Sequence, residues 1–179
     1  SEDENMQLAF VNKEDIHTAT AAKVFSVKQN DVTREMRGKA KAVNFGIIYG
    51  QSAFGLSQNL NISRGEAKEI IENYFIQYPK IRTYMDKTIE TAKTNGYVET
   101  ILGRRRYLKD INSSNAIVRG HAERNAVNAP IQGSAADIIK IAMINIHAGM
   151  KESTFKSKML LQVHDELVFD AHNNETDRL

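Results

Sequence analysis

Residues 37–50, with the sequence RGKAKAVNFGIIYG, carry cationic and aromatic side chains at a spacing of four residues. Asp31-Val32-Thr33 before it offers a polar start, so we predict a long helix from Asp31 to about Tyr49 that ends at Gly50. Side chains four residues apart in such a helix form a slowly winding stripe, since each step advances about 40° past a full turn. In this stripe two cations come first and two aromatic rings follow: Arg37, Lys41, Phe45 and Tyr49.

This order of side chains suits a nucleotide that lies lengthwise along the helix. Guanidinium and ammonium groups bind phosphate oxygens, whereas flat aromatic faces suit a sugar and a base. The spacing alone also fits a plainer interpretation, in which Phe45 and Tyr49 belong to the core while Arg37 and Lys41 lie on a solvated face.

The regions on both sides of this helix are also rich in helix-forming residues, and the first helix of the chain is expected to begin at about Asp15. Further helices are expected over 15–25, 53–59, from the capping box at Ser63-Arg64-Gly65-Glu66 onward, over 81–94, over 115–128 and over 135–150. Pro130 should kink or interrupt the last two. A strand is expected over 97–102, followed by a basic turn at Arg104-Arg105-Arg106 that forms a candidate phosphate patch.

The end of the chain changes to a strand pattern. Residues 159–163 and 167–169 are apolar except for Gln162 and flank His164-Asp165-Glu166, which predicts a buried β-hairpin that presents a charged tip. Two adjacent carboxylates can provide oxygen ligands for Mg²⁺, although polar residues are also what hairpin tips ordinarily carry. The fold class is therefore α+β and mainly helical.

Composition narrows the possible classes of protein. The 179 residues are 41% hydrophobic and 26% charged, which is typical of globular proteins, and the absence of Cys excludes disulfides and thiol catalysis. We find no apolar run of about 18 residues for a membrane span and no secretory leader. The net charge of +2 is too small to point to a nucleic-acid partner.

A third candidate set lies around Pro130. Arg124 precedes Asn128 and Gln132, whose amides carry both donors and acceptors and so suit base edges. The same amides could instead cap a helix at a proline break.

Together these stretches resemble one known family. Residues 37–50 are similar to the fingers helix of the family A DNA polymerases, with Arg, three residues, Lys, three residues, Phe-Gly, two residues and Tyr-Gly. Residues 162–166, Gln-Val-His-Asp-Glu, resemble the palm motif of that family. Three more stretches fit in the expected order: Asp15-Ile16-His17-Thr18, Gly103-Arg104-Arg105-Arg106-Tyr107 and residues 130–137.

The resemblance implies a helical fingers subdomain plus part of an antiparallel palm sheet. It places a palm-side lead-in at 1–14, the fingers with their basic turn at 15–114 and a partial palm at 115–179. The implied activity is that of a bacterial, cytoplasmic DNA-directed DNA polymerase, which adds dNTPs to a primer 3′-hydroxyl on primer-template DNA with two Mg²⁺ ions, away from any membrane.

The resemblance also implies roles for individual residues. Arg37, Lys41 and His17 would bind the phosphates of the incoming nucleotide, and Lys41 would protonate the leaving pyrophosphate. Phe45 would pack on the sugar and base, and Tyr49 would lie by the template base. Asp165 would bind Mg²⁺ with support from Glu166. The duplex near the primer terminus would contact His164, Arg124, Asn128 and Gln132.

We expect the chain to be only part of such an enzyme. The other metal-binding Asp of the family lies in a strand just before the position of Ser1, so the isolated chain is expected to be inactive. A hairpin without its neighbouring strands is expected to self-associate. Two other classes stay open: a fragment of a single-subunit RNA polymerase, against which Phe45 argues, and a non-catalytic module that binds nucleic acid or nucleotide without turnover.

Overall fold

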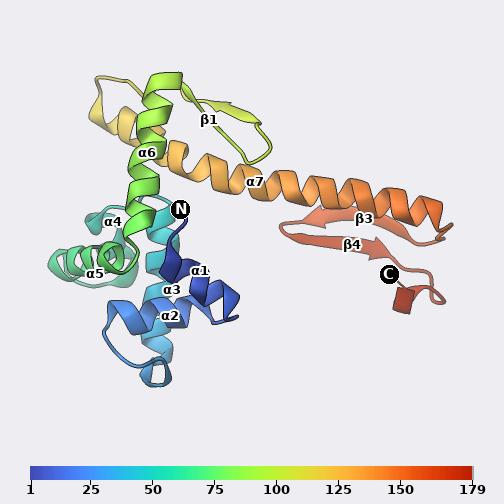
Figure 1. Cartoon of the computed structure of the whole chain (residues 1–179), viewed down its shortest axis with the longest axis horizontal. Helices are drawn as coiled ribbons and strands as arrows, with labels where there is room; N and C mark the ends of the chain where they lie inside the picture. The colour runs from blue at the N-terminus through green and yellow to red at the C-terminus, as the bar shows by residue number, and fades with distance from the viewer. Residues whose placement is uncertain (179) are drawn as a thin grey trace. The chain divides into compact units, whose positions relative to one another are not determined.

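The computed structural model describes residues 1–178 and is mainly helical, with two small antiparallel hairpins, which confirms the α+β class (Figure 1). No helix in this part of the chain is long and apolar enough to cross a membrane. The elements in chain order are α1 (Glu4–Val11), α2 (Ile16–Val24), η1 (Gln29–Asp31), α3 (Arg34–Ile48), α4 (Ala53–Leu60), α5 (Arg64–Gln77), α6 (Pro79–Asn95), β1 (Tyr97–Glu99), β2 (Arg105–Tyr107), α7 (Ala116–Glu152), β3 (Lys158–Val163), β4 (Glu166–Asp170) and η2 (Thr176–Arg178).

The chain divides into two compact units, each described by itself. The first unit comprises Ser1–Glu99 with Arg105–Pro130, and the second comprises Thr100–Arg104 with the chain from Ile131 onward. α7 contributes to both, because the division falls directly after Pro130.

Polar caps set the starts of the helices in the first unit. The side chains of Asp15, Thr33 and Ser63 accept hydrogen bonds from backbone N–H groups three residues later, at 2.7, 3.2 and 3.1 Å. Such caps satisfy donors that the first helical turn leaves unpaired. The predicted long helix is confirmed, and Gly50 follows its end with a φ of +64°.

The chain has a helix before the predicted first one, because α1 begins at Glu4. Its cap is Asp3, which is only 2% exposed and accepts from the backbone N–H of Met6 at 3.2 Å. The other carboxylate oxygen accepts from the N–H of Lys80 at 3.1 Å. Pro79 has no N–H, so Lys80 provides the first backbone donor of α6. This contact joins residues 77 positions apart, which no local pattern reveals.

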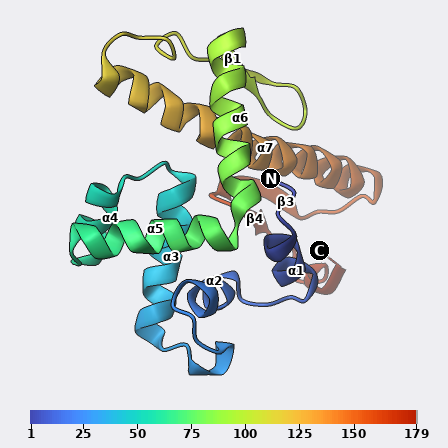
Figure 2. The same ribbon diagram turned by 60° about the vertical axis from the view of Figure 1, so that its left-hand side comes forward.

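The main core of the first unit lies where α2, α3, α4 and α5 pack together (Figure 2). Tyr74 and Tyr78 are both fully buried in it, with ring centroids 4.9 Å apart. The Tyr78 hydroxyl lies 3.4 Å from Thr20 Oγ1, whereas the Tyr74 hydroxyl has no partner among the described residues. The remaining buried residues of this core are Val24, Val43, Ile47, Leu56, Ala67 and Ile70.

The first hairpin is shorter than predicted. β1 ends at Glu99 instead of residue 102, and Tyr97, Val98 and Glu99 pair with Tyr107, Arg106 and Arg105 of β2. Residues 100–104 form a turn, in which Gly103 adopts a φ of +78° and its N–H donates to the Thr100 carbonyl at 2.9 Å. A backbone that reverses direction in this way cannot continue a strand.

The prediction of two helices separated by Pro130 is also wrong, because α7 runs from Ala116 to Glu152 without a break. Proline removes one helical hydrogen bond. In the second unit, contacts from the 100–104 turn stabilise the part of α7 that follows. Arg104 Nη2 donates to the Gly133 carbonyl at 3.1 Å, and Arg104 Nε donates to Asp137 Oδ1 at 2.8 Å. A Cβ on Gly133 would lie 2.6 Å from Thr100 Cγ2, so glycine permits this close approach.

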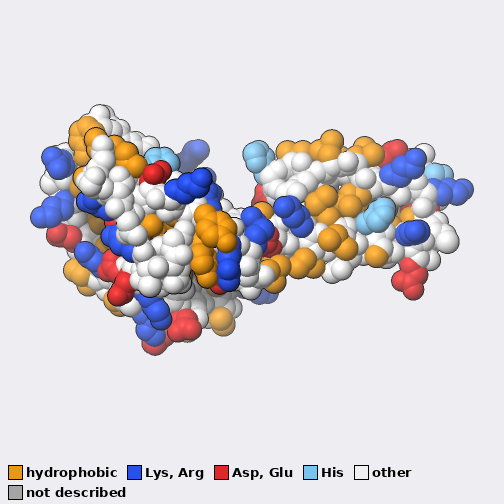
Figure 3. All heavy atoms as spheres, turned by 90° about the horizontal axis from the view of Figure 1, so that it is seen from above, with side chains coloured by type: hydrophobic (Ala, Val, Ile, Leu, Met, Phe, Trp, Pro, Cys, Tyr) orange, Lys and Arg blue, Asp and Glu red, His pale blue; other side chains and the backbone are white. Residues whose placement is uncertain are grey.

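The second hairpin is confirmed, with Val163 paired to Glu166 across the two-residue turn His164-Asp165. The expectation that its strands are buried is wrong for the described residues, since Leu160 and Leu161 are 58% and 50% exposed. Hydrophobic side chains accordingly appear on the surface of the second unit (Figure 3), including three from α7: Ile138, Ile141 and Ile144.

The carboxylate of Glu175 links the segment after β4 to the segment before β3 through hydrogen bonds. Glu175 accepts hydrogen bonds from the N–H groups of Lys156 and Ser157 and from Ser157 Oγ, the last at 2.6 Å. These hydrogen bonds lower the pKa of Glu175 to about 2, and the bond from the Ser157 hydroxyl has the largest effect.

Candidate functional site

A cavity of about 740 Å³ in the first unit brings three residues of the predicted stripe together. Lys41, Phe45 and Tyr49 line it from α3 and its end, and Arg124 lines it from α7. Arg37 does not line the cavity. Its remaining walls are small or uncharged residues: Gly38, Ala42, Gly46, Gly50, Gln51, Ser52, Gly55 and Asn59.

The two aromatic rings face solvent, so the interpretation that assigned them to the core is wrong. Phe45 and Tyr49 are 45% and 46% exposed. Their rings stack with centroids 6.3 Å apart and an interplanar angle of 13°. Together they form an apolar wall on which a flat ring could stack.

Glycines allow two side chains to approach α3 closely. A Cβ on Gly50 would lie 2.7 Å from Arg124 Cγ, and a Cβ on Gly46 would lie 2.5 Å from Gln51 Oε1. Larger residues at these two positions would push Arg124 and Gln51 away from the cavity. The Gly-rich sequence after Phe45 therefore shapes the cavity wall.

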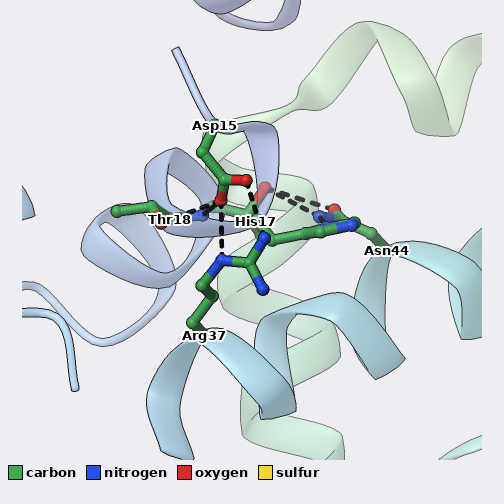
Figure 4. Close-up of polar contacts among 6 residues, drawn as sticks. Asp15, His17, Thr18, Arg37 and Asn44 are labelled. Carbon is green, nitrogen blue, oxygen red and sulfur yellow. Dashed lines mark hydrogen bonds and ion pairs between the residues drawn. The ribbon is translucent and has the colours of Figure 1, made fainter. Parts of the chain in front are cut away.

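Arg37 forms an ion pair with Asp15 on the exposed side of α2 (Figure 4). Arg37 Nε donates to Oδ1 at 3.0 Å and Nη2 donates to Oδ2 at 2.7 Å. The hydrogen bond from Arg37 holds the pKa of the Asp15 carboxyl well below its usual range, and Asp15 raises the pKa of Arg37. A guanidinium has five N–H groups, so three stay available for an anion.

His17 belongs to the first turn of α2, and its side chain contacts α3 near the aromatic wall. Its ring centroid is 5.9 Å from that of Phe45, and its Nδ1 lies 3.1 Å from Asn44 Nδ2. Burial lowers the pKa of His17; the positive charges of Arg37 and Lys41 act in the same direction, and Asp15 opposes them. The imidazole is therefore neutral at pH 7.

The predicted duplex-binding residues lie on α7 and at the hairpin tip. Arg124 is exposed, and Asn128, one turn later, is half-buried with an Oδ1 that has no hydrogen-bond partner among residues 1–178. Gln132 is exposed on the part of α7 that belongs to the second unit. His164 is exposed at the hairpin tip, where its φ of +55° forms the turn.

Two carboxylates are the candidate metal ligands. Asp165 occupies the hairpin turn and Glu166 begins β4, and both side chains are exposed. No group of three or more metal-ligating side chains occurs in the described part of the chain. The two carboxylates fit an ion such as Mg²⁺, which often takes one or two carboxylates and completes its shell with water and phosphate oxygens.

Comparison with protein families decides where this chain belongs. The family model for DNA polymerase family A matches residues 1–179. The chain belongs to DNA polymerase family A. The family suggested by the motifs of the sequence is thus confirmed.

Curated relatives of this family A chain are named DNA polymerase I. That of Caldicellulosiruptor bescii is 55% identical over 177 residues, which cover 99% of this chain and 21% of the relative. That of Bacillus caldotenax is 55% identical over 179 residues, which cover 100% of this chain and 20% of the relative. The chain therefore spans about a fifth of the length of these relatives.

A solved structure of the family has the same fold. It is described as the POL domain of Pol1 from M. smegmatis in complex with DNA primer-template and dNTP. The match has a TM-score of 0.94 at 48% identity and covers 98% of this chain and 31% of that chain.

Sequence reasoning on this family A chain did not identify the residues that hold the predicted site residues in place. Asp15 was noted only as part of a motif, and Asn44 and Thr20 were not singled out. One signal was available for Asn44. It follows Arg37 by seven residues, so both lie on the same face of α3, toward α2.

Proposed function

We propose that the chain is the nucleotide-binding fingers and part of the palm of a DNA-directed DNA polymerase, which extends a primer on template DNA. The observation that carries this proposal is the cavity beside α3, where Lys41 and Arg124 lie around the stacked rings of Phe45 and Tyr49. Cations beside a flat apolar wall match a nucleoside triphosphate paired with a template base.

In this function the stripe on α3 would bind the incoming dNTP. Lys41 and Arg37 would neutralise its phosphates, and His17 would donate a hydrogen bond to them. Phe45 would pack on the sugar and base, and Tyr49 would lie beside the template base. The primer 3′-hydroxyl would attack the α-phosphate in line, and Lys41 would give a proton to the leaving pyrophosphate.

The duplex would be held by polar side chains on α7 and the hairpin. Arg124 would bind backbone phosphates, while Asn128 and Gln132 would contact base edges in the minor groove. Acceptors in that groove are common to all base pairs, so such contacts test shape instead of sequence. His164 would lie near the primer terminus.

Asp165, with Glu166 in support, would hold Mg²⁺. Bound Mg²⁺ supplies charge stabilisation for the transferred phosphate and activates the attacking hydroxyl. Water and substrate phosphates would complete the ligand set of the ion.

Primer extension tests the proposal. A full-length polymerase that carries these 179 residues should extend a primer with Mg²⁺ and four dNTPs. Asp165→Ala should abolish extension, whereas Asp170→Ala at the other end of β4 should not. Duplex binding without any extension would instead favour a non-catalytic binding module, and a preference for ribonucleotides would favour an RNA polymerase.

The isolated chain should bind DNA weakly, in a strongly salt-dependent manner, and should not extend primers. We expect the polymerase to act in the bacterial cytoplasm, because its curated relatives are bacterial. The exposed apolar side chains of the second unit should also make the isolated chain self-associate at high concentration, which light scattering would detect.

A further inference from the structure

Asn44 contacts His17, and this contact suggests a role for an amide that lies outside the α3 stripe. We propose that Asn44 is a positioning residue that holds His17 as the tautomer with its proton on Nε2, ready to donate a hydrogen bond to a phosphate oxygen. The link to phosphate rests on the proposed function, whereas the tautomer itself does not.

The direction of the hydrogen bond decides the tautomer. Asn44 Nδ2 lies 3.1 Å from His17 Nδ1, and an amide nitrogen can only donate. Nδ1 must therefore accept, and the proton of the neutral imidazole lies on Nε2. Nε2 has no partner within residues 1–178, so its N–H is available to a ligand.

A buried hydroxyl, that of Thr20, holds the Asn44 amide in place. Thr20 is fully buried and Asn44 is 6% exposed. Thr20 Oγ1 lies 3.2 Å from Asn44 Oδ1 and 3.1 Å from its Nδ2, and it also contacts the Tyr78 hydroxyl at 3.4 Å. A buried polar group with satisfied partners has little freedom to move, so these contacts hold the Asn44 amide beside His17.

Two contacts hold the first turn of α2 against one face of α3. Arg37 binds Asp15, and Asn44, seven residues later, binds His17. The imidazole is therefore bound at Nδ1 and lies near the Phe45 ring, whose centroid is 5.9 Å away. This arrangement leaves Nε2 as the ring atom that can reach a ligand beside the aromatic wall.

Burial keeps His17 neutral by lowering its pKa, and the charges around the ring act on it in both directions. Asp15 lies on its own element, and Arg37 and Lys41 face it from α3. Protonation would place a third positive charge beside two cations and an N–H against the Asn44 amide. His17 therefore binds phosphate as a hydrogen-bond donor instead of as a cation, and its contribution should not change between about pH 7 and 9.

NMR spectroscopy of the isotope-labelled chain tests the tautomer directly. Long-range proton–nitrogen correlations report which ring nitrogen carries the proton. We expect the His17 proton on Nε2. A proton on Nδ1 in the unmodified chain would overturn the proposal, and this measurement needs no variant that could fail to fold.

Asn44→Asp provides the second measurement. A carboxylate only accepts, so it should move the proton to Nδ1 and raise the midpoint of the His17 titration by about one pH unit or more. The matched control is Asn125→Asp, since Asn125 Nδ2 makes the same contact with His121 Nδ1 at 3.0 Å on exposed α7. The control should leave His17 unchanged. Equal titrations of His17 in both variants would contradict the proposal.

The link to phosphate is tested in the full-length polymerase. Asn44→Ala should raise the KM for dNTP roughly 10-fold, the loss expected for one hydrogen bond to a charged group, with little change in kcat. An unchanged KM would overturn the link. A polymerase without activity, combined with the expected tautomer, would count against the proposed function and not against the role of Asn44.

Discussion

The buried pair Tyr74 and Tyr78 predicts opposite effects for the same substitution. Both side chains are fully buried, but among the described residues only the Tyr78 hydroxyl of this pair has a partner, Thr20 Oγ1 at 3.4 Å. A buried polar group left unpaired costs about 1–3 kcal/mol. Removing the Tyr74 oxygen opens a void of roughly 10–15 Å³, which costs only about 0.3 kcal/mol at about 24 cal/mol per Å³. Tyr74→Phe should therefore stabilise the first unit by about 1–2 kcal/mol.

Tyr78→Phe provides the matched comparison. It removes the same atom but breaks a hydrogen bond, so it should destabilise the unit by about 0.5–1 kcal/mol. For a protein of this size, 1 kcal/mol corresponds to a Tm change of about 2–4 °C. Calorimetry and circular dichroism of the three proteins would measure the difference. If Tyr74→Phe lowered Tm as much as Tyr78→Phe does, the Tyr74 hydroxyl must have a partner and the reasoning fails.

Three further predictions concern the site and the hairpin. Lys41→Ala should lower the single-turnover rate of the full-length polymerase about 10²–10³-fold, because charge grows on the leaving phosphates. The control Lys39→Ala should have little effect on this rate, since Lys39 pairs with Glu35. Equal losses of rate in the two variants would refute this role of Lys41. Gly50→Ala should cost about 1–2 kcal/mol because of its φ of +64°, and it should weaken DNA binding by displacing Arg124. The control Gly38→Ala has nothing within 4 Å of its new Cβ and should not destabilise the helix. Denaturation of the two variants would measure the difference in their stability. Finally, the pKa of Glu175 falls from 4.5 to about 2 on folding, so its contribution to stability is present above about pH 4.5 and is lost as the pH falls toward 2. Hydrogen exchange of the Lys156 and Ser157 amides should therefore become faster as the pH falls over that range. In the Glu175→Gln variant, the exchange of these two amides should not show this dependence on pH.

Local sequence patterns predicted the elements that depend on local chemistry. Thr33 and Ser63 carry cap side chains, and the α3 and α5 helices begin directly after them. The hairpin follows from the apolar strands on both sides of residues 164–166, although Glu166, expected in the tip, is the first residue of β4. The stripe on α3 placed Lys41, Phe45 and Tyr49 around one cavity, because four-residue spacing keeps side chains near one another.

Features that depend on distant residues were missed. α7 continues through Pro130, and the next turns of the helix are bound by Arg104, which lies 29 and 33 residues from its partners Gly133 and Asp137. The presence of a proline in the sequence does not reveal that hydrogen bonds from a distant arginine stabilise the helix after it. Asn44 was overlooked for a similar reason, since its importance comes from Thr20 and His17 on another helix.

Asp3 makes the ends of two helices open together. Its carboxylate closes the first turn of α1 through Met6 and the first turn of α6 through Lys80. When α1 frays and Asp3 moves away, both N–H groups become accessible to solvent in the same event. Hydrogen exchange at Met6 and Lys80 should then report one shared opening free energy, although the two amides are 74 positions apart in the sequence. Removing the first four residues of the chain would therefore remove Asp3 and, with it, the side-chain cap of α6, a helix that begins at position 79.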